Sequence, residues 1–399
     1  MTVQTTANLT NAIRTQYVAE YIKAAQRMRI YDQLALPVPG ISVQEAMKGS
    51  SVLYNFLSDL QIVTAAISQT ADITPAILYD ATASVTPTSR DNAVQWSENL
   101  DIQAYTNRGA ATYEALGLNQ MESVDHIAAG VATAGSWFWR NAARASLDKD
   151  TAGDRASDAL FSRASVYLEQ AKSPPFMGTD GNSAWGCIMH PFPFYDIRES
   201  GNVDSIGLYQ EAGIHLNHEL GKLGPFRLSV TPFAHVFYAA GVANGTAVSS
   251  TLATATNPLA TSFDMAAAGS TAAGMWLTIG PVETAAVMYP DTERVYVTGV
   301  ATNTISFIGE GSNAGLRFPH AAGVAISNAD SVYPLIFGGP ASMVKLYAPS
   351  VGEFGQTVGP KVSGLADQFT SLAWKWYGGY GRIAENRLFR MEVSASMDL

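Results

Sequence analysis

The sequence of 399 residues is poor in charge. Only 15% of its residues are Asp, Glu, Lys or Arg, against roughly a quarter in an average soluble domain. Hydrophobic residues make up 47%, which excludes a disordered chain, because disorder needs low hydrophobicity and high charge. A coiled-coil rod is excluded as well, since its heptads need charged flanks. No stretch reaches about 18 uninterrupted apolar residues and no leader pattern opens the chain, so we expect neither a membrane span nor a signal peptide.

Cysteine and basic residues are also scarce. The single cysteine, Cys187, lies in the apolar run 185–189, which excludes a disulfide within the chain and favours a buried structural thiol over a nucleophile. The chain has 24 Lys and Arg against 34 Asp and Glu, a net charge of −10. Proteins that hold DNA or RNA by its phosphates normally carry a basic excess, so nucleic-acid binding is not expected as the main task.

Motifs for catalysis are missing too: there is no GxSxG nucleophile elbow, no Walker phosphate loop and no defensible acid–base pair of carboxylates. His215 and His218 lie three residues apart with Glu219 outside the pair, unlike the HExxH motif of zinc proteases. An ordinary polar helix face is favoured, and a metal-dependent hydrolase using His215 and His218 remains a remote alternative. We therefore expect no enzyme, no catalytic residue, no cofactor and no metal site.

The first feature that the sequence does contain is an amphipathic segment. Over residues 12–29 apolar side chains recur at close to helical spacing, and the run LPVPG at 36–40 ends the pattern. Residues 1–48 are therefore predicted to form an extended arm with one helix. Because the arm has little to pack on within itself, we expect its apolar face to contact a neighbouring subunit, through Ile13, Tyr17, Tyr21 and Ile22.

A long hairpin is predicted next. Val52, Tyr54 and Phe56 alternate with polar or smaller residues, as in a strand, and a second extended stretch covers residues 93–105. The connection between them is rich in Thr, Ala and Ser, which predicts a protruding extended loop at 49–93; a protrusion of that length is usually functional. Its candidates for inter-subunit contact are the apolar residues Ile73, Ile77, Leu78 and Tyr79.

The rest of the chain mixes helices and strands, which makes an α+β fold. Helices are expected at 124–147, 160–168, 193–198 and 208–220. Strands are expected at 185–189, 226–231, 294–300, 304–308, 323–327, 333–337, 343–347, 372–380 and 388–393. The intervening segment 246–274 is almost all small and polar, so we predict a long surface loop there.

Aromatic and basic residues alternate over the last two strands, which we expect to pair. Such an array could stack bases, but the negative net charge favours core packing on one face and subunit contact on the other. At least one of Trp374 and Trp376 is expected in the core, and Arg387 and Arg390 are contact candidates. The glycine-rich run 378–381 between the two strands predicts a bend where another backbone comes close, rather than a phosphate loop.

The order of these elements resembles the major capsid protein of tailed bacteriophages, the Hong Kong 97-type fold. Residues 1–48 match the N-terminal arm of that family, 49–93 its extended loop and 124–147 its spine helix. WGCIMHPFPFYDIRES (185–200) resembles the strand, turn and helix that open its axial domain, and GKLGPFRLSVTP (221–232) its glycine-led strand. The most specific likeness lies in the C-terminal strands, VYPLIFGGPASMVKLYA (332–348) and LAWKWYGGYGRIAENRLFRMEVSAS (372–396).

The resemblance implies a domain plan and a function. A peripheral domain would cover 94–182, completed by 345–383, and an axial domain 183–344, completed by 384–399, with a β-rich insertion at about 242–330. The implied function is a structural subunit that self-assembles, as hexamers and pentamers, into the icosahedral head shell around double-stranded DNA. It would be made in the cytoplasm of a bacterial host and reside in the virion, with no membrane partner.

Other implied partners are a portal, a scaffolding protein and decoration proteins, with the DNA enclosed but not bound by sequence. An encapsulin-like nanocompartment, which uses the same fold to hold cargo enzymes, is the alternative. Some members of this fold cross-link neighbouring subunits by a Lys–Asn isopeptide bond, which needs an amine on the loop. Residues 61–93 contain no lysine, so we expect a shell held by non-covalent contacts.

Overall fold

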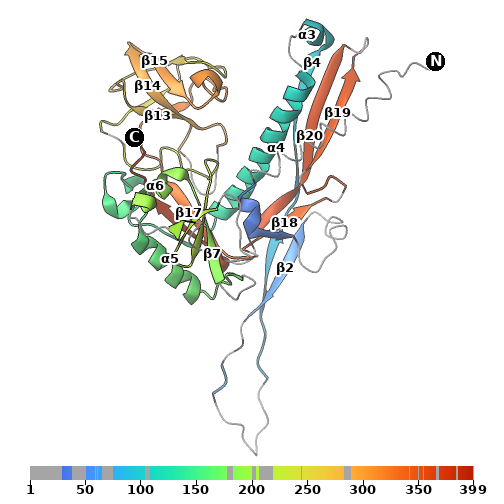
Figure 1. Ribbon diagram of the computed structural model, residues 1–399, viewed down its shortest axis with the longest axis vertical. Helices are drawn as coiled ribbons and strands as arrows, with labels where there is room; N and C mark the ends of the chain where they lie inside the picture. Colours follow the sequence, from blue (N-terminus) through green and yellow to red (C-terminus); the bar gives the residue numbers. More distant parts are fainter. Residues whose placement is uncertain are drawn as a thin grey trace, which may run out of the picture. The chain divides into compact units, whose positions relative to one another are not determined.

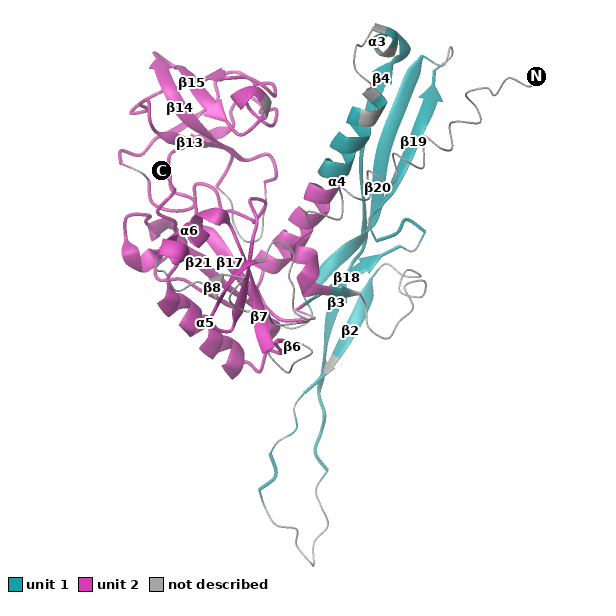
Figure 2. Ribbon diagram, viewed as in Figure 1, with its two compact units in different colours: residues 1–24, 36–120, 343–383 teal, residues 25–35, 121–342, 384–399 magenta. Residues whose placement is uncertain are grey.

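The computed structural model describes residues 29–37, 51–58, 60, 62–64, 75–103, 108–177, 183–199, 204–205, 219–243, 245–282, 289–340, 342–348, 350–353, 355–364, 368–382 and 385–398. The chain divides into two compact units, coloured separately in Figure 2: unit 1 comprises residues 1–24, 36–120 and 343–383, and unit 2 comprises 25–35, 121–342 and 384–399. The arm candidates Ile13, Tyr17, Tyr21 and Ile22, the loop candidate Ile73 and the histidines 215 and 218 lie outside the described residues.

Unit 1 is built around one sheet, which in the described residues has the strand order β1-β18-β20-β19, with β4 also paired to β20 (Figure 1). The strands are β1 (Ala35–Pro37), β4 (Thr88–Ser97), β18 (Met343–Tyr347), β19 (Gln356–Ser363) and β20 (Phe369–Arg382). The long strand β20 is central because β4 pairs with it on one side, and β18 and β19 pair with it as well. Its side chains are therefore the best placed to form the core of unit 1.

Two tryptophans of β20 fill that core. Trp374 and Trp376 are each 2% exposed, so the prediction that at least one is buried is confirmed. Their ring nitrogens are satisfied, because Trp374 Nε1 donates to Asn119 Oδ1 at 3.1 Å and Trp376 Nε1 donates to the carbonyl of Glu353 at 3.2 Å. The expected pairing of the last two strands is wrong. After the short helix η7 (Glu385–Arg387), strand β21 (Leu388–Val393) joins a different sheet.

The long helix α4 spans Arg108–Thr133 and not 124–147 as expected, and a short helix α3 (Glu98–Gln103) precedes it. Its buried stripe begins with Tyr113 and Leu116, well before the segment on which the prediction rested. The helix ends at Thr133, whose hydroxyl donates back to the carbonyl of Ala129 at 2.9 Å. The aromatic residues beyond Gly135 then form strand β5 (Phe138–Trp139), which pairs with β21. Phe138 and Trp139, which the helical periodicity assigned to the predicted helix, therefore belong to a sheet.

In unit 2 a second sheet runs, over the described residues, in the order β5-β21-β17-β7-β10-β9-β8, with β6 on β7 (Figure 1). Its remaining strands are β6 (Phe176–Met177), β7 (Ser183–Met189), β8 (Asp204–Ser205), β9 (Glu219–Leu223), β10 (Phe226–Val230) and β17 (Tyr333–Gly338). Helices α5 (Asp158–Gln170) and α6 (Pro191–Glu199) confirm the predicted helices at 160–168 and 193–198. Apolar side chains of α5, β7, β10 and β17 form one core cluster.

Cys187 lies in that cluster on β7. It is fully buried, and burial raises the pKa of its thiol well above the ordinary value. Because the thiolate is the reactive form, this confirms the prediction of an inert structural cysteine.

The insertion forms a sheet with its own core. Over the described residues its strands lie in the order β11-β16-β13-β14-β15-β12, and they are β11 (Ser249–Thr251), β12 (Ser262–Asp264), β13 (Trp276–Ile279), β14 (Glu293–Ala301), β15 (Thr304–Gly309) and β16 (Ala325–Ser327). The surface loop expected at 246–274 is therefore wrong. Its few large apolar residues point inward, and Val248, Leu252, Phe263 and Met265 are all buried beside Leu277 and Val295.

The described end of the N-terminal arm is bound firmly to unit 2. Ile30 and Tyr31 are fully buried, and both of their backbone N–H groups donate to Asp125 Oδ1 at 3.0 Å. The Tyr31 hydroxyl accepts a hydrogen bond from the backbone N–H of His235 at 3.2 Å. Burial raises the pKa of Asp125 to about 7, against the opposing effect of these N–H donors.

None of the described helices is long and apolar enough to cross a membrane.

Candidate functional site

A two-stranded hairpin is the most distinctive feature of unit 1. Strand β2 (Val52–Leu57) pairs antiparallel with β3 (Asp80–Val85), in a register that places Val52 opposite Val85 and Leu57 opposite Asp80. The first strand matches the prediction, but the expected partner at 93–105 is wrong. That stretch belongs to β4 and α3, because Thr86 and Pro87 separate β3 from a strand that pairs with β20 instead.

The root of the hairpin is part of the core of unit 1. Val52 and Val85 are buried against Val344 and Leu346 of β18, and the half-buried Tyr54 packs on the same cluster. Burying side chains of this size stabilises the fold by about 1.5–3 kcal/mol each. The hairpin is therefore anchored at its base and is not a loosely attached loop.

Glycines in β20 permit this close packing. A Cβ on Gly379 would lie 2.8 Å from the carbonyl oxygen of Thr86, and a Cβ on Gly381 would collide with the side chain of Val85. The prediction that the run 378–381 marks a place where another backbone comes close is confirmed, and the approaching segment is the end of the hairpin.

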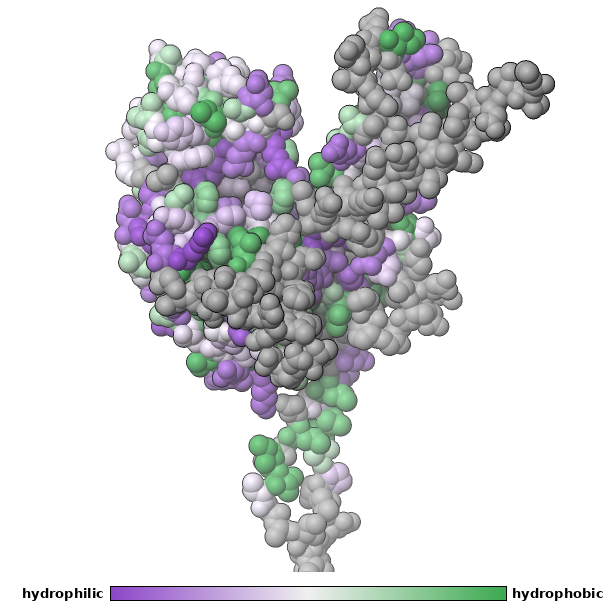
Figure 3. Space-filling view, viewed as in Figure 1, coloured by the Kyte–Doolittle hydropathy of each residue, from purple (hydrophilic) through white to green (hydrophobic). Residues whose placement is uncertain are grey.

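Away from its root the hairpin exposes large apolar side chains. Leu57 is 69% exposed, Ile62 86% and Tyr79 69%, and Figure 3 shows the apolar colour along this segment. Strand pairing continues just past β2, because the backbone N–H of Ser58 donates to the carbonyl of Tyr79 at 2.7 Å. Contiguous exposed apolar patches are uncommon on monomeric proteins, and large ones are often functional. We name it the hairpin patch, formed by Leu53, Leu57, Leu60, Ile62, Val63, Ile77, Leu78 and Tyr79.

Three of the predicted contact residues, Ile77, Leu78 and Tyr79, are exposed in the hairpin patch, as a contact role requires. Whether they contact a neighbour stays a prediction. The sequence reasoning missed the residues of the first half of the hairpin, although Leu53 and Leu57 gave a signal. They place apolar side chains on the second face of a strand whose other face already carries Val52 and Tyr54.

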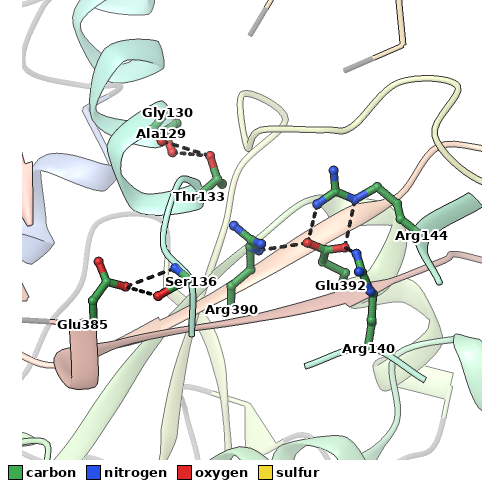
Figure 4. Close-up of polar contacts among 9 residues, drawn as sticks. All are labelled: Ala129, Gly130, Thr133, Ser136, Arg140, Arg144, Glu385, Arg390 and Glu392. Atoms are coloured by element: carbon green, nitrogen blue, oxygen red, sulfur yellow. Dashed lines mark hydrogen bonds and ion pairs between the residues drawn. The ribbon is translucent and has the colours of Figure 1, made fainter. Parts of the chain in front are cut away.

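A cluster of charged side chains lies in unit 2 around the buried carboxylate of Glu392 (Figure 4). Arg144 binds it through Nε and Nη2 at 2.9 and 2.5 Å, Arg390 Nε lies 3.0 Å from Oε1, and Arg140 Nη1 lies 3.3 Å from Oε2. Burial tends to raise the pKa of Glu392, but the hydrogen bond from Arg144 and the three positive charges hold it below the ordinary value. Nearby, the backbone N–H and hydroxyl of Ser136 donate to Glu385.

Arg387 and Arg390 were both predicted to contact a neighbouring subunit. Arg390 is 3% exposed and is engaged with Glu392 inside its own subunit, so we do not carry it forward as a surface contact. Arg387 lies in η7 and is half-buried, and its carbonyl accepts a hydrogen bond from Ser342 at 2.9 Å. The contact role of Arg387 stays a prediction.

Two of the described histidines, His190 and His320, have polar partners within the chain. His190 Nδ1 accepts the backbone N–H of Phe192 at 3.2 Å, and burial together with the charge of Arg294 lowers its pKa to about 3. His320 lies 2.7 Å from Glu293. Within the described residues no three His, Cys, Asp or Glu side chains gather in a way that could hold a metal ion.

These elements together define the fold of phage capsid subunits, as the resemblance of the sequence to the Hong Kong 97-type fold predicts. Solved structures with this fold include the capsid of Ralstonia phage GP4, at a TM-score of 0.50 and 12% identity over 87% of this chain and 84% of that one. The capsid of Cyanophage Pam1 matches at a TM-score of 0.51 and 11% identity, over 93% of this chain and 94% of that one. No family model and no curated protein matches the sequence.

Proposed function

We propose that the chain is the major shell subunit of a tailed-phage head, assembling through contacts between its own copies. The observation that carries the proposal is the hairpin patch on a fold shared with phage capsids over nearly the whole chain. A monomeric protein gains nothing by exposing so many large apolar side chains on an anchored hairpin, whereas a shell subunit buries them against its neighbour.

The mode of contact follows from the hairpin's construction. Its root is fixed by Val52 and Val85, so the patch is presented at a defined place on each subunit. Preorganisation of this kind reduces the entropy lost on association. Every copy both presents a hairpin and offers a surface to the hairpin of another copy, so contacts propagate from subunit to subunit. Closed rings of six and five such subunits would form the hexamers and pentamers of an icosahedral shell.

The charge of the chain supports the proposed contents of the shell. A net charge of −10 disfavours tight binding of phosphates, which suits a container whose double-stranded DNA must move during filling and release. A structural role also explains why the sequence offers no catalytic motif. A portal, a scaffolding protein and decoration proteins are the further partners that we propose, with the virion as the final location.

Electron microscopy of the purified chain, expressed alone and together with its neighbouring genes, tests the proposal. We expect closed particles of uniform size, with hexameric and pentameric clusters in averaged images. Particles that form around a cargo enzyme, in the absence of portal and packaging genes, would favour a nanocompartment instead. A chain that stays monomeric under all these conditions would contradict the proposal.

A further inference from the structure

Three arginines, Arg140, Arg144 and Arg390, lie around the carboxylate of Glu392 (Figure 4). We call them the arginine cluster. Within the described part of the chain, Arg140 and Arg144 form no ion pair with any carboxylate other than Glu392. Two guanidinium groups therefore share one negative charge even before Arg390 is counted. In a protein with ten more acidic than basic residues, this local excess is conspicuous.

Aromatic rings hold the guanidinium groups in position. The Cζ of Arg140 lies 4.8 Å from the centroid of the Phe138 ring, and that of Arg390 lies 4.9 Å from the same ring. Arg144 lies over Phe237 at 4.0 Å. A cation–π contact restricts a guanidinium without neutralising its charge. Arg140 and Arg144 thus present fixed positive charge that Glu392 offsets only in part, which is what an oxyanion site requires.

The cluster opens to solvent at one end. The side chain of Arg140 is 32% exposed and Phe138 is 39% exposed, whereas the side chains of Arg144 and Arg390 are 16% and 4% exposed. An approaching ligand therefore meets Arg140 first, beside an exposed aromatic ring. Arginine and aromatic residues are the types enriched at protein–protein interfaces.

The buried histidine beside the cluster responds to its positive charge. Burial lowers the pKa of His235 to about 3, and the positive charges of His126, Arg144 and Arg390 act in the same direction. The charges of Arg144 and Arg390 therefore act on this buried ring.

We propose that the arginine cluster is a docking site for a carboxylate side chain of a second copy of this chain, with Arg140 making the direct contact. The inference rests on the proposed function, which supplies the second copy. Charge complementarity identifies the occupant, because 34 acidic residues against 24 basic ones give neighbouring copies an excess of carboxylates. The planar fork of arginine matches a carboxylate through two parallel N–H···O bonds. A nucleic-acid phosphate has similar chemistry, but the net charge of the chain opposes its approach.

Unassembled subunits test the site itself, with inorganic phosphate as the probe oxyanion. The variant is Arg140→Gln, and the matched control is Arg163→Gln, since Arg163 is exposed and stacks on Trp139 at 4.4 Å without an ion pair among the described residues. At constant ionic strength, replacing chloride by phosphate should raise the melting temperature of the wild type and of Arg163→Gln but not of Arg140→Gln. No phosphate-dependent rise in the wild type would overturn the site.

Assembly tests the occupant. We expect Arg140→Gln to raise the critical subunit concentration for particle formation by about tenfold, equivalent to about 1.4 kcal/mol, and to weaken its dependence on salt, whereas Arg163→Gln should match the wild type. An unchanged critical concentration, or a variant that loses only the binding of short duplex DNA, overturns the second copy as occupant. If the wild type forms no particles, the proposed function and this occupant both fail, while the phosphate titration still reports on the site.

Discussion

The carboxylate of Asp398 forms an ion pair with the guanidinium of Arg294, 104 positions earlier in the chain, and joins the C-terminal segment to strand β14 of the insertion. Asp398 is fully buried and also accepts hydrogen bonds from the backbone N–H of Ser331 at 2.6 Å and from the hydroxyl of Tyr333 at 3.0 Å. The penultimate residue thus connects the insertion to β17 within unit 2.

Replacing Asp398 by Asn should therefore destabilise the fold. The change leaves the buried charge of Arg294 without its partner, which typically costs about 3–5 kcal/mol. Urea unfolding followed by fluorescence measures the loss. The exposed Asp150→Asn is the control and should change the unfolding free energy by less than about 0.5 kcal/mol. Equal stability of Asp398→Asn and the wild type would show that the ion pair contributes nothing.

Removing either tryptophan of β20 should cost more than any exposed substitution in the same unit. Trp374 and Trp376 are each 2% exposed, and replacing a buried Trp by Ala typically costs about 3–5 kcal/mol. Val362→Ala in the neighbouring strand β19 is a suitable control, since Val362 is 56% exposed. Chemical denaturation of the three variants gives the comparison, and two tryptophan variants as stable as the control would refute the core assignment.

Polar substitutions in the hairpin patch should impair assembly and leave the folding of the subunit intact. Leu57→Ser and Ile62→Ser change side chains that are 69% and 86% exposed, so the melting temperature of the subunit should stay within a few degrees of wild type. Particle yield in electron micrographs should fall sharply, because each lost side chain removes about 1.5–3 kcal/mol of apolar burial per contact. Val166→Ser, on the exposed face of α5, controls for a general effect of lost hydrophobicity. Normal particle yield from both hairpin variants would disprove the contact role.

Mature particles boiled in detergent should run as one band near 42.4 kDa on a denaturing gel. Residues 61–93 provide no lysine for an isopeptide bond, and the only cation in that loop, Arg90, is a poor nucleophile because its guanidinium stays protonated. Cys187 is buried and cannot link subunits. A ladder of multimers that resists boiling would contradict a non-covalent shell.

Acid should destabilise unit 2 through two buried histidines. Burial lowers the pKa of both His190 and His235 to about 3, with positive neighbours adding to the effect, whereas a histidine in the unfolded chain takes up its proton near pH 6.5. Because the folded pKa is the lower one, the stability is fully present above about pH 6.5 and is lost as the pH falls towards 3.

Scanning calorimetry at several pH values in that range tests the effect. The melting temperature of the wild type should fall with pH, and that of His190→Asn and His235→Gln should fall less steeply, whatever their stability at pH 7. Parallel curves for all three proteins would show that these histidines do not control the acid response.

The sequence was most informative where pattern and packing agree. Strand β7 and helix α5 were predicted to within two residues at each end, because their apolar side chains face one core. The predicted helix at 124–147 extended too far because Phe138 continues the helical spacing of its apolar residues. Only the pairing of Arg390 with Phe138 reveals that Phe138 and Trp139 form a strand. The pairing with the distant strand β21 decided the local structure of residues 138–139, and the spacing of apolar residues gives no information about such distant partners.

The sequence predicts an exposed apolar loop, but it does not predict which strands pair or which distant residues meet. The apolar residues at 77–79 predict a contact role for the extended loop, but its strand partner depends on the register between Val52 and Val85, which lie far apart in the sequence. The arginine cluster was beyond prediction, because Arg140, Arg144 and Glu392 meet only when β21 pairs with β5. Sequence patterns reveal faces of single elements, whereas these sites are made by the pairing of distant ones.

The burial of Cys187 makes the chain a convenient scaffold for chemical labelling. As the only thiol in 399 residues, fully enclosed and with its pKa raised, it gives maleimide reagents no native target on the folded subunit. A cysteine introduced on the exposed face of α5 or of the insertion sheet would then react alone. Dyes, spin labels or peptides could be attached at one chosen position per subunit, without first removing a native thiol.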